Sequence, residues 1–297
     1  MLLPYKRTMI SIIIPTYNRE RLIKKSVMSV LEQTYTDIEV IVVDDGSTDD
    51  TKNIIATIND DRLKYIYQTN GGACKARNTG INLAKGDFIA FHDSDDVWHE
   101  NKLEKEYNKL ISEKVDVVFC KLNYHNPNGQ VEKLPIGIPE GNIGLNNNLF
   151  GIGTQTLLGK QNVFKDIMFD SSLPRFQDLE LLVRIAKKYK IYCLNDGLVE
   201  YNVNMDSISS NPYKILEAFN IIIKRHPDLN AQSPDTIKSL SNALKGAADE
   251  LYLHGDKKYR QFIKISFKYD KSLKKIVRLF ASYTNLYGLL LKCKKGN

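Results

Sequence analysis

Short apolar runs alternate with stretches of helical periodicity along the N-terminal part of the chain. Runs that are apolar throughout and of strand length are typical of strands buried on both faces of a parallel sheet. Such runs occupy 9–15, 38–43, 63–67, 88–91 and 115–122. Helical periodicity fills the intervals at 21–31, around 54–58, at 72–84 and at 101–111. This alternation, at a spacing of about 25 residues, predicts an α/β fold with a mostly parallel, doubly wound central sheet and helices on both faces.

The pattern changes after this region. Residues 123–148, rich in Gly, Asn and Pro, predict a loop or hairpin region over the sheet. A helix is expected at 178–189, then strands at 191–194 and 199–203, and then helices at 213–224, 234–253, 257–267 and 272–291. We therefore expect two domains: an α/β domain over 1–210 and a basic helical C-terminal region over 211–297.

Composition narrows the class of protein. Hydrophobic residues make up 42% and charged residues 26% of the chain, as in ordinary globular proteins. No apolar run approaches the roughly 18 residues of a spanning helix, and the first residues lack the apolar core and cleavage site of a signal peptide. The four cysteines are widely spaced and form no CxxC pair, which indicates reduced thiols in a cytoplasmic protein.

The net charge of +7 is unevenly distributed. Residues 1–210 hold 25 basic and 28 acidic side chains, whereas 211–297 hold 17 and 7. In 257–295, basic residues combine with apolar ones in a pattern suited to an anionic membrane surface, which would place the protein peripherally at the inner face of the membrane. Alternatively, the apolar face packs on the first domain or on a second copy of the chain, as a homo-oligomer, with the lysines in water. Nucleic-acid binding is disfavoured because the basic region contains no recognisable module.

Polar clusters follow three of the predicted strands, at 15–19, 44–47 and 93–96. In open α/β sheets, ligands bind outside the carboxyl ends of the strands. Asp93 and Asp95, two apart on an extended segment, would point the same way and reach one Mg²⁺ or Mn²⁺ ion. The alternative is a solvated acidic turn or a helix N-cap. Gly71-Gly72 before a helix, with Lys75 and Arg77 in its first turns, could receive phosphate.

Six ordered motifs resemble family 2 glycosyltransferases, the inverting, nucleotide-sugar-dependent group with the GT-A (Rossmann-like) fold. The motifs are SIIIPTYN at 11–18, VDDGSTD at 43–49, ARNTG at 76–80, DSDDVW at 93–98, GTQT at 153–156 and FQDLELLVR at 176–184. The resemblance covers residues 9–205. It implies a UDP-sugar donor, a divalent cation (Mn²⁺ or Mg²⁺), and a glycan or lipid-linked saccharide acceptor in surface polysaccharide or glycoconjugate synthesis.

The resemblance also implies roles for individual residues. Pro15 and Tyr17 would line the nucleotide-base pocket, and Asp45 would accept a hydrogen bond from uracil N3–H. Asp95 and Asp93 would hold the metal, with Asp93 also near the ribose. The other donor contacts implied are those of Asn18, Lys75, Arg77, Ser94 and Trp98. For Trp98, packing at the start of a helix is an equal alternative.

Asp178 would be the general base that removes the proton from the acceptor hydroxyl; its structural alternative is a helix N-cap. Two positions depart from the family pattern. Gln177 stands where Glu often precedes the Asp, and Asn204 stands where many relatives carry a histidine, so a third metal ligand is open between Asp206 and water. Outside the enzymes, the alternative function is a catalytically inactive nucleotide-sugar-binding or scaffold protein at the membrane.

Overall fold

The computed structural model describes residues 8–125, 129–201, 211–284 and 286–295. The chain divides into two compact units. The first comprises 1–144, 151–171 and 177–204, and the second comprises 145–150, 172–176 and 205–297. Two short stretches, 145–150 and 172–176, thus belong with the C-terminal helices. The expected division at residue 210 placed both of them in the first domain.

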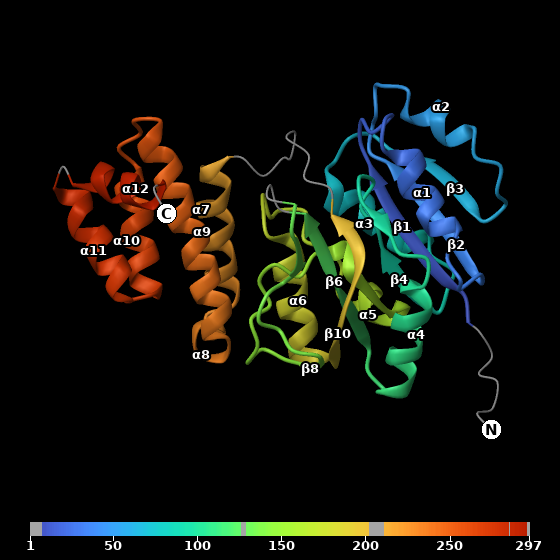
Figure 1. Cartoon of the computed structure of the whole chain (residues 1–297). Coiled ribbons are helices and arrows are strands. Elements are labelled where there is room, and N and C mark those ends of the chain that lie inside the picture. The colour runs from blue at the N-terminus through green and yellow to red at the C-terminus, as the bar shows by residue number, and fades with distance from the viewer. Residues whose placement is uncertain (1–7, 126–128, 202–210, 285, 296–297) are drawn as a thin grey trace. The chain divides into compact units, whose positions relative to one another are not determined.

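A ten-stranded sheet forms the centre of the first unit (Figure 1). Its main path has the order β3-β2-β1-β4-β9-β6-β10-β5, and β7 and β8 pair with β6 and β10. The strands are β1 (Ile10–Thr16), β2 (Ile38–Asp44), β3 (Leu63–Tyr67), β4 (Phe88–Phe91), β5 (Val97–Trp98), β6 (Val117–His125), β7 (Val131–Leu134), β8 (Gly141–Ile143), β9 (Leu157–Lys160) and β10 (Ile191–Tyr201).

Helices cover both faces of this sheet, so the α/β prediction is confirmed. They are α1 (Ile23–Leu31), α2 (Thr51–Ala56), α3 (Ala73–Leu83), α4 (Lys102–Ser112), α5 (Gln161–Asp166) and α6 (Gln177–Lys188), with a short 3₁₀ helix at Thr154–Thr156. Helices α1 and α4 share one buried apolar cluster with Ile12 and Ile14. On the opposite face, α3 approaches β1 so closely that a Cβ at Gly80 would lie 2.4 Å from Ile13 Cγ2.

The sheet is mixed, because β9 runs antiparallel between β4 and β6. Strands β1 to β4 are parallel to one another, as are β6 and β10. Since β9 opposes both β4 and β6, all six parallel strands run in one direction. The carboxyl ends of β1, β2, β4, β6 and β10 therefore meet at one edge of the sheet, the edge where the predicted ligand residues lie.

Two sequence predictions of element boundaries were wrong. The strands expected at 191–194 and 199–203 form the single strand β10, whose pairing with β6 shifts register around Gly197. The single helix expected at 272–291 is two helices, because Thr284 adopts an extended conformation and ends the first of them.

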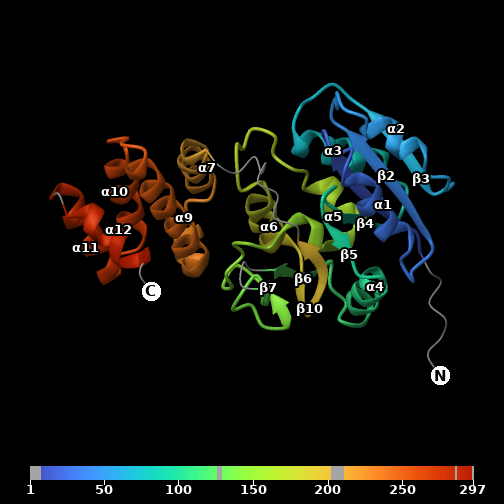
Figure 2. The same ribbon diagram turned by 45° about the horizontal axis from the view of Figure 1, so that its top comes forward.

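The second unit is helical throughout its described elements (Figure 2). Its helices are α7 (Pro212–Arg225), α8 (Leu229–Gln232), α9 (Pro234–Leu253), α10 (Tyr259–Tyr269), α11 (Leu273–Tyr283) and α12 (Tyr287–Lys295). The long helix α9 packs against α7, α8 and α10. The rings of Tyr252, Tyr259 and Tyr287 lie 5.0–5.1 Å apart and join α9, α10 and α12. None of the described helices combines the length and apolarity that crossing a bilayer requires.

Candidate functional site

Arg77, Asp93 and Asp178 converge from three elements of the first unit. Arg77, on α3, donates from Nη2 to Asp93 Oδ1 at 2.7 Å, and its guanidinium lies 5.4 Å from the centre of the Phe169 ring. Arg77 Nε is buried and makes no hydrogen bond within the described part of the chain. A buried N–H donor of this kind, beside an ion pair, suits an oxygen of an anionic ligand.

The charge of Asp178 is set by this neighbourhood. Burial raises the pKa of Asp178 above its usual range; Arg77 works in the opposite direction, and the negative charge of Asp93 adds to the increase. A carboxylate that holds its proton more tightly than usual is a stronger base at neutral pH. The position expected for the general base therefore has the electrostatics of one.

Asp178 does not cap its helix in the way that the structural alternative required. Helix α6 begins at Gln177, so Asp178 lies within the first turn, and its Oδ1 accepts from the Leu179 backbone N–H at 2.8 Å. Both candidates for a third metal ligand, Asn204 and Asp206, lie outside the described residues.

Asp93 and Asp95 belong to a turn after β4 rather than to the extended segment that the sequence suggested. The Asp96 backbone N–H closes this turn on the Asp93 carbonyl at 3.2 Å. Asp93 faces Arg77, whereas Asp95 Oδ2 lies 3.7 Å from Arg19 Nε. The expectation of an extended segment is therefore wrong, and the two carboxylates are carried by one turn.

Two residues to which the sequence analysis gave no individual role lie beside this turn. Arg19 directly follows the first motif and approaches Asp95. Tyr201 ends β10; burial raises the pKa of its phenol, and the charges of Asp96, Asp95 and Asp93 raise it further. Tyr201 carries no motif of its own, so only its place at the end of a strand could have indicated it.

Asp44, the last residue of β2, and Asp45, which follows it, have different hydrogen-bond partners. Asp44 Oδ1 accepts from the Ser47 backbone N–H at 2.8 Å and closes a turn. Asp45 is buried, and its Oδ1 accepts from Gln68 Nε2 at 2.7 Å and from the Gly71 N–H at 2.9 Å. Its Oδ2 accepts from the Gly72 N–H at 2.7 Å. Asp45 thus fastens the loop before α3, and one lone pair of Oδ2 is left over.

The glycine pair and its lysine are also close together. Gly72 has φ +88°, a backbone conformation that suits glycine, and it directly precedes α3. The Lys75 side chain lies over Gly71, where an added Cβ would be 2.4 Å from Lys75 Cδ. Lys75 is exposed, so its ammonium group is accessible near the start of the helix.

The last residues of the first motif, 17–18, follow β1 and form a loop that is hydrogen-bonded to the loop after β2. Asn18 has φ +51°; its backbone N–H donates to Ser47 Oγ at 2.9 Å, and its Oδ1 accepts from the Thr48 N–H at 2.9 Å. Pro15 is buried in β1 beside Val43. Tyr17 is 43% exposed, which leaves a ring face open to a ligand.

Trp98 and Ser94, two of the expected donor contacts, are buried. Trp98 is 3% exposed and lies in the main apolar cluster, where its Nε1–H donates to the Gln155 carbonyl at 3.2 Å. The Lys102 ammonium lies 4.0 Å from the ring centre. The indole is therefore used for packing, the alternative considered for Trp98, and we do not place it in the donor site.

The chemistry of the carboxylates fits a divalent cation. Mg²⁺ in phosphate-binding sites commonly takes one or two carboxylates and completes its shell with substrate phosphates and water. Asp93 and Asp95 provide hard oxygen ligands from one turn, and their side chains are 27% and 25% exposed. No cluster of three or more metal-ligating side chains occurs among the described residues. Asp93 and Asp95 are therefore the carboxylates of this turn that could hold such an ion.

Comparison with known proteins gives the family. Residues 11–173 match the model described as "Glycosyl transferase family 2". Two Escherichia coli proteins, the UDP-Glc:α-D-GlcNAc-diphosphoundecaprenol β-1,3-glucosyltransferases WfgD and WfaP, are 34% and 36% identical to the chain. Each match spans 70% of this chain, and 83% of WfgD or 82% of WfaP.

Solved structures confirm the fold. S. aureus TarS 1–349 in complex with UDP-GlcNAc superimposes with a TM-score of 0.69 at 23% identity, covering 88% of this chain and 81% of that one. This likeness concerns the architecture, and the GT-A fold expected from the motifs is confirmed. The family model covers more than half of the chain, and both curated relatives are matched over most of their length. The chain belongs to glycosyl transferase family 2 and is a glycosyltransferase.

Proposed function

We propose that the chain is an inverting, metal-dependent glycosyltransferase that moves a sugar from a UDP-sugar to a hydroxyl group of a lipid-linked saccharide in surface polysaccharide synthesis. The observation that carries the proposal is the position of Asp178, whose pKa is raised, beside the Arg77–Asp93 ion pair. The donor and acceptor classes are supported by WfgD and WfaP, whose names give UDP-Glc as donor and a GlcNAc-diphospholipid as acceptor.

Asp178 acts as the general base in this proposal. It accepts the proton of the acceptor hydroxyl as that oxygen attacks the anomeric carbon, while the bond to the donor diphosphate breaks. A single in-line displacement inverts the configuration at that carbon. Arg77, with its buried Nε–H, stabilises the negative charge that develops on the leaving diphosphate.

Asp95 and Asp93 would hold the divalent ion, Mg²⁺ or Mn²⁺, together with the donor diphosphate. When bound, the ion offsets the charge of the departing phosphate groups. Arg19 and Arg77 already lie beside these carboxylates and reduce their mutual repulsion. As the resemblance suggested, water or Asp206 would complete the shell.

The nucleotide half of the donor site comprises Tyr17 and the residues near α3. The exposed ring of Tyr17 would stack on the base beside Pro15. The spare lone pair of Asp45 would accept from uracil N3–H, and Lys75 would contact a phosphate at the start of α3. Asn18 shapes the loop that carries Tyr17.

We place the reaction at the cytoplasmic face of the membrane, with the protein bound peripherally through its basic helical region, 257–295. The relatives' diphosphoundecaprenol acceptors are membrane lipids in chemical character, because a long hydrocarbon chain partitions into the bilayer. The buried thiols of Cys74, Cys120 and Cys193 are unpaired, in keeping with a reducing compartment.

The decisive experiment compares the purified protein with its Asp178→Asn variant. We expect the protein to bind UDP in the presence of Mn²⁺ or Mg²⁺ and to transfer sugar from one member of a UDP-sugar panel to a GlcNAc-diphospholipid. The variant should retain UDP binding and lose turnover by a factor of about 10³ or more. Asp166→Asn is the matched control, because Asp166 pairs with Lys188 and Tyr189 outside this site.

Transfer by Asp178→Asn at the parent rate would remove Asp178 from the mechanism. UDP binding without hydrolysis or transfer of any UDP-sugar by the parent protein would favour the alternative function, a binding or scaffold protein at the membrane.

A further inference from the structure

A basic cavity lies within the second unit, between α9 and α11. Its volume is about 920 Å³, within the ~300–1,000 Å³ range of ordinary ligand sites. Five basic side chains and one carboxylate line it, with apolar side chains at the rim. The lining residues are Lys238, Asn242, Lys245, Asp270, Ser272, Leu273, Lys274, Lys275, Val277, Arg278 and Leu290.

The single carboxylate of the lining does not neutralise the cavity. Asp270 Oδ2 pairs with the buried Lys275 ammonium at 2.9 Å, and its Oδ1 accepts from the Ser272 N–H at 3.0 Å. Lys275 also donates to Ser241, and Arg278 pairs with Asp249, which lies outside the lining. These contacts hold the cavity wall in place and leave the exposed Lys238 and Lys274 as surplus positive charge.

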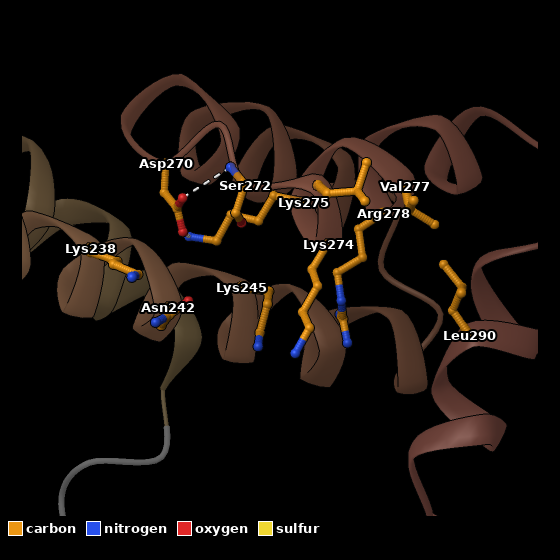
Figure 3. Close-up of a pocket in the computed structure, with 11 residues that line it drawn as sticks. Lys238, Asn242, Lys245, Asp270, Ser272, Lys274, Lys275, Val277, Arg278 and Leu290 are labelled. Carbon is orange, nitrogen blue, oxygen red and sulfur yellow. Dashed lines mark hydrogen bonds and ion pairs between the residues drawn. The ribbon is translucent and has the colours of Figure 1, made fainter.

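Three of the five basic side chains of the lining lie close together. In Figure 3, the side chains of Lys245, Lys274 and Arg278 extend in parallel, with their nitrogen ends close to one level. Lys274 and Arg278 stand one helical turn apart on α11. Burial lowers the pKa of Lys275, and repulsion by the positive charge of Lys238 lowers it further. An anion placed among these groups would relieve that repulsion.

An apolar stripe on α11 borders the cavity. Leu273, Ile276, Val277 and Phe280 recur at helical spacing on this helix and are exposed, Leu273 by 75% and Phe280 by 69%. Leu286 and Leu289 add exposed apolar surface on the next segment. A helix with a basic pocket on one side and exposed large apolar side chains on the other matches a ligand with an anionic head and a hydrocarbon tail.

We infer that this cavity binds the phosphate headgroup of an anionic phospholipid, with the exposed side chains of α11 entering the acyl region of the bilayer. The inference deepens the membrane location within the proposed function and rests on that part of it, while the chemistry at Asp178 is independent. The shared chemistry is a phosphate anion, which could also come from a soluble phosphate; the apolar stripe favours the lipid.

The experiment is cosedimentation of the full chain with vesicles of phosphatidylcholine, with and without phosphatidylglycerol. We expect binding only to the anionic vesicles. Lys238→Glu and Lys274→Glu should each weaken binding at least fivefold, since one basic residue near an anionic surface contributes about 1 kcal/mol. Lys224→Glu is the matched control, an equal charge change on an exposed residue of α7 outside the cavity, and should change binding little.

Two further measurements distinguish a phospholipid from a soluble phosphate as the ligand of the cavity. Phe280→Ser should weaken vesicle binding about tenfold or more, because the phenyl group that enters the acyl region of the bilayer is lost. Inorganic phosphate should compete only weakly. Full competition by inorganic phosphate, or no effect of Phe280→Ser, would mean a soluble phosphate site and would overturn the lipid assignment.

An equal loss in Lys224→Glu would show diffuse charge attraction without a pocket. Retained vesicle binding together with a change in oligomeric state in Phe280→Ser would make the stripe an interface between copies of the chain. Thermal melts and UDP-sugar hydrolysis in solution are measured for every variant. Unchanged hydrolysis with lost vesicle binding supports the inference, whereas absent hydrolysis in the parent protein concerns the proposed function alone.

Discussion

Arg77 and Asp93 form an ion pair with an Nη2–Oδ1 distance of 2.7 Å, which ties α3 to the turn after β4. Asp178 lies close enough for both charges to act on its pKa, in opposite directions. A change in either Arg77 or Asp93 should therefore alter the titration of Asp178.

Asp178→Asn should make the fold at least as stable as the parent at neutral pH. Because the folded-state pKa of Asp178 is raised, ionisation opposes folding. The cost is absent below the unfolded-state value of about 3.9 and fully present above the raised one. The variant's advantage in free energy of unfolding, measured by denaturant titration, should therefore appear as pH rises through that window. A variant less stable than the parent at pH 7 contradicts this account.

Arg77→Gln should move the acid limb of the pH–rate profile to higher pH. Arg77 lowers the pKa of Asp178, so its loss lets burial and Asp93 raise that pKa further. The rate should also fall about tenfold or more at neutral pH, because a donor to the leaving group is gone. The profile of kcat/KM against pH measures both effects, and Arg62→Gln, which breaks the pair with Asp60, is the control. An unshifted acid limb would separate Arg77 from Asp178.

Asp45→Asn should destabilise the fold by about 2 kcal/mol, since hydrogen bonds to a charged group are lost and an amide N–H₂ must face backbone donors. The donors are Gln68, Gly71 and Gly72, so the loop before α3 would loosen. Thermal denaturation measures the loss, with the exposed Asp50→Asn as control. UDP titration well below the melting temperature tests the proposed hydrogen bond from uracil N3–H to Asp45. Unchanged affinity would mean that Asp45 only holds the loop in place.

Glu106→Ala should cost about 3–5 kcal/mol, because it leaves Lys102 as an unpaired buried charge. Their Nζ–Oε2 distance is 2.6 Å, and both side chains are fully buried beneath Trp98. The double variant Lys102→Met/Glu106→Leu should recover most of the loss. Chemical denaturation of the three proteins gives the comparison, and a double variant as unstable as the single one would argue against an uncompensated charge.

Local patterns predicted much of the fold. The strands 63–67 and 88–91 and the helix 234–253 have the bounds expected from apolar runs and helical periodicity. Strand β9 was not predicted, because its four residues, Leu-Leu-Gly-Lys, have no alternation and gain their stability from two partner strands. The glycine of β9 is explained by tertiary packing, because a Cβ at Gly159 would lie 2.9 Å from both Phe164 and Val117.

The candidate site was predicted where side chains sit on ordered motifs and missed where the contact is long-range. Arg77, Asp93 and Asp178 each belong to one of the six motifs, and they lie together although two of them are on helices. Neither the turn that separates Asp93 from Asp95 nor the burial of Trp98 can be read from spacing, since both depend on packing. The approach of Tyr201 to the acidic turn depends on the pairing of β10 with β6 and β5.

The antiparallel strand β9 acts as a spacer that fixes the alignment of two otherwise separate parallel blocks. Leu158 pairs with both Ala90 of β4 and Val118 of β6, so a slip of one residue in β9 would disturb both blocks at once. Loops on the β6–β10 side can therefore change in length without displacing β1 to β4, provided that residues 157–160 keep their pairing. The pairing of these four residues thus sets the register between the two halves of the sheet.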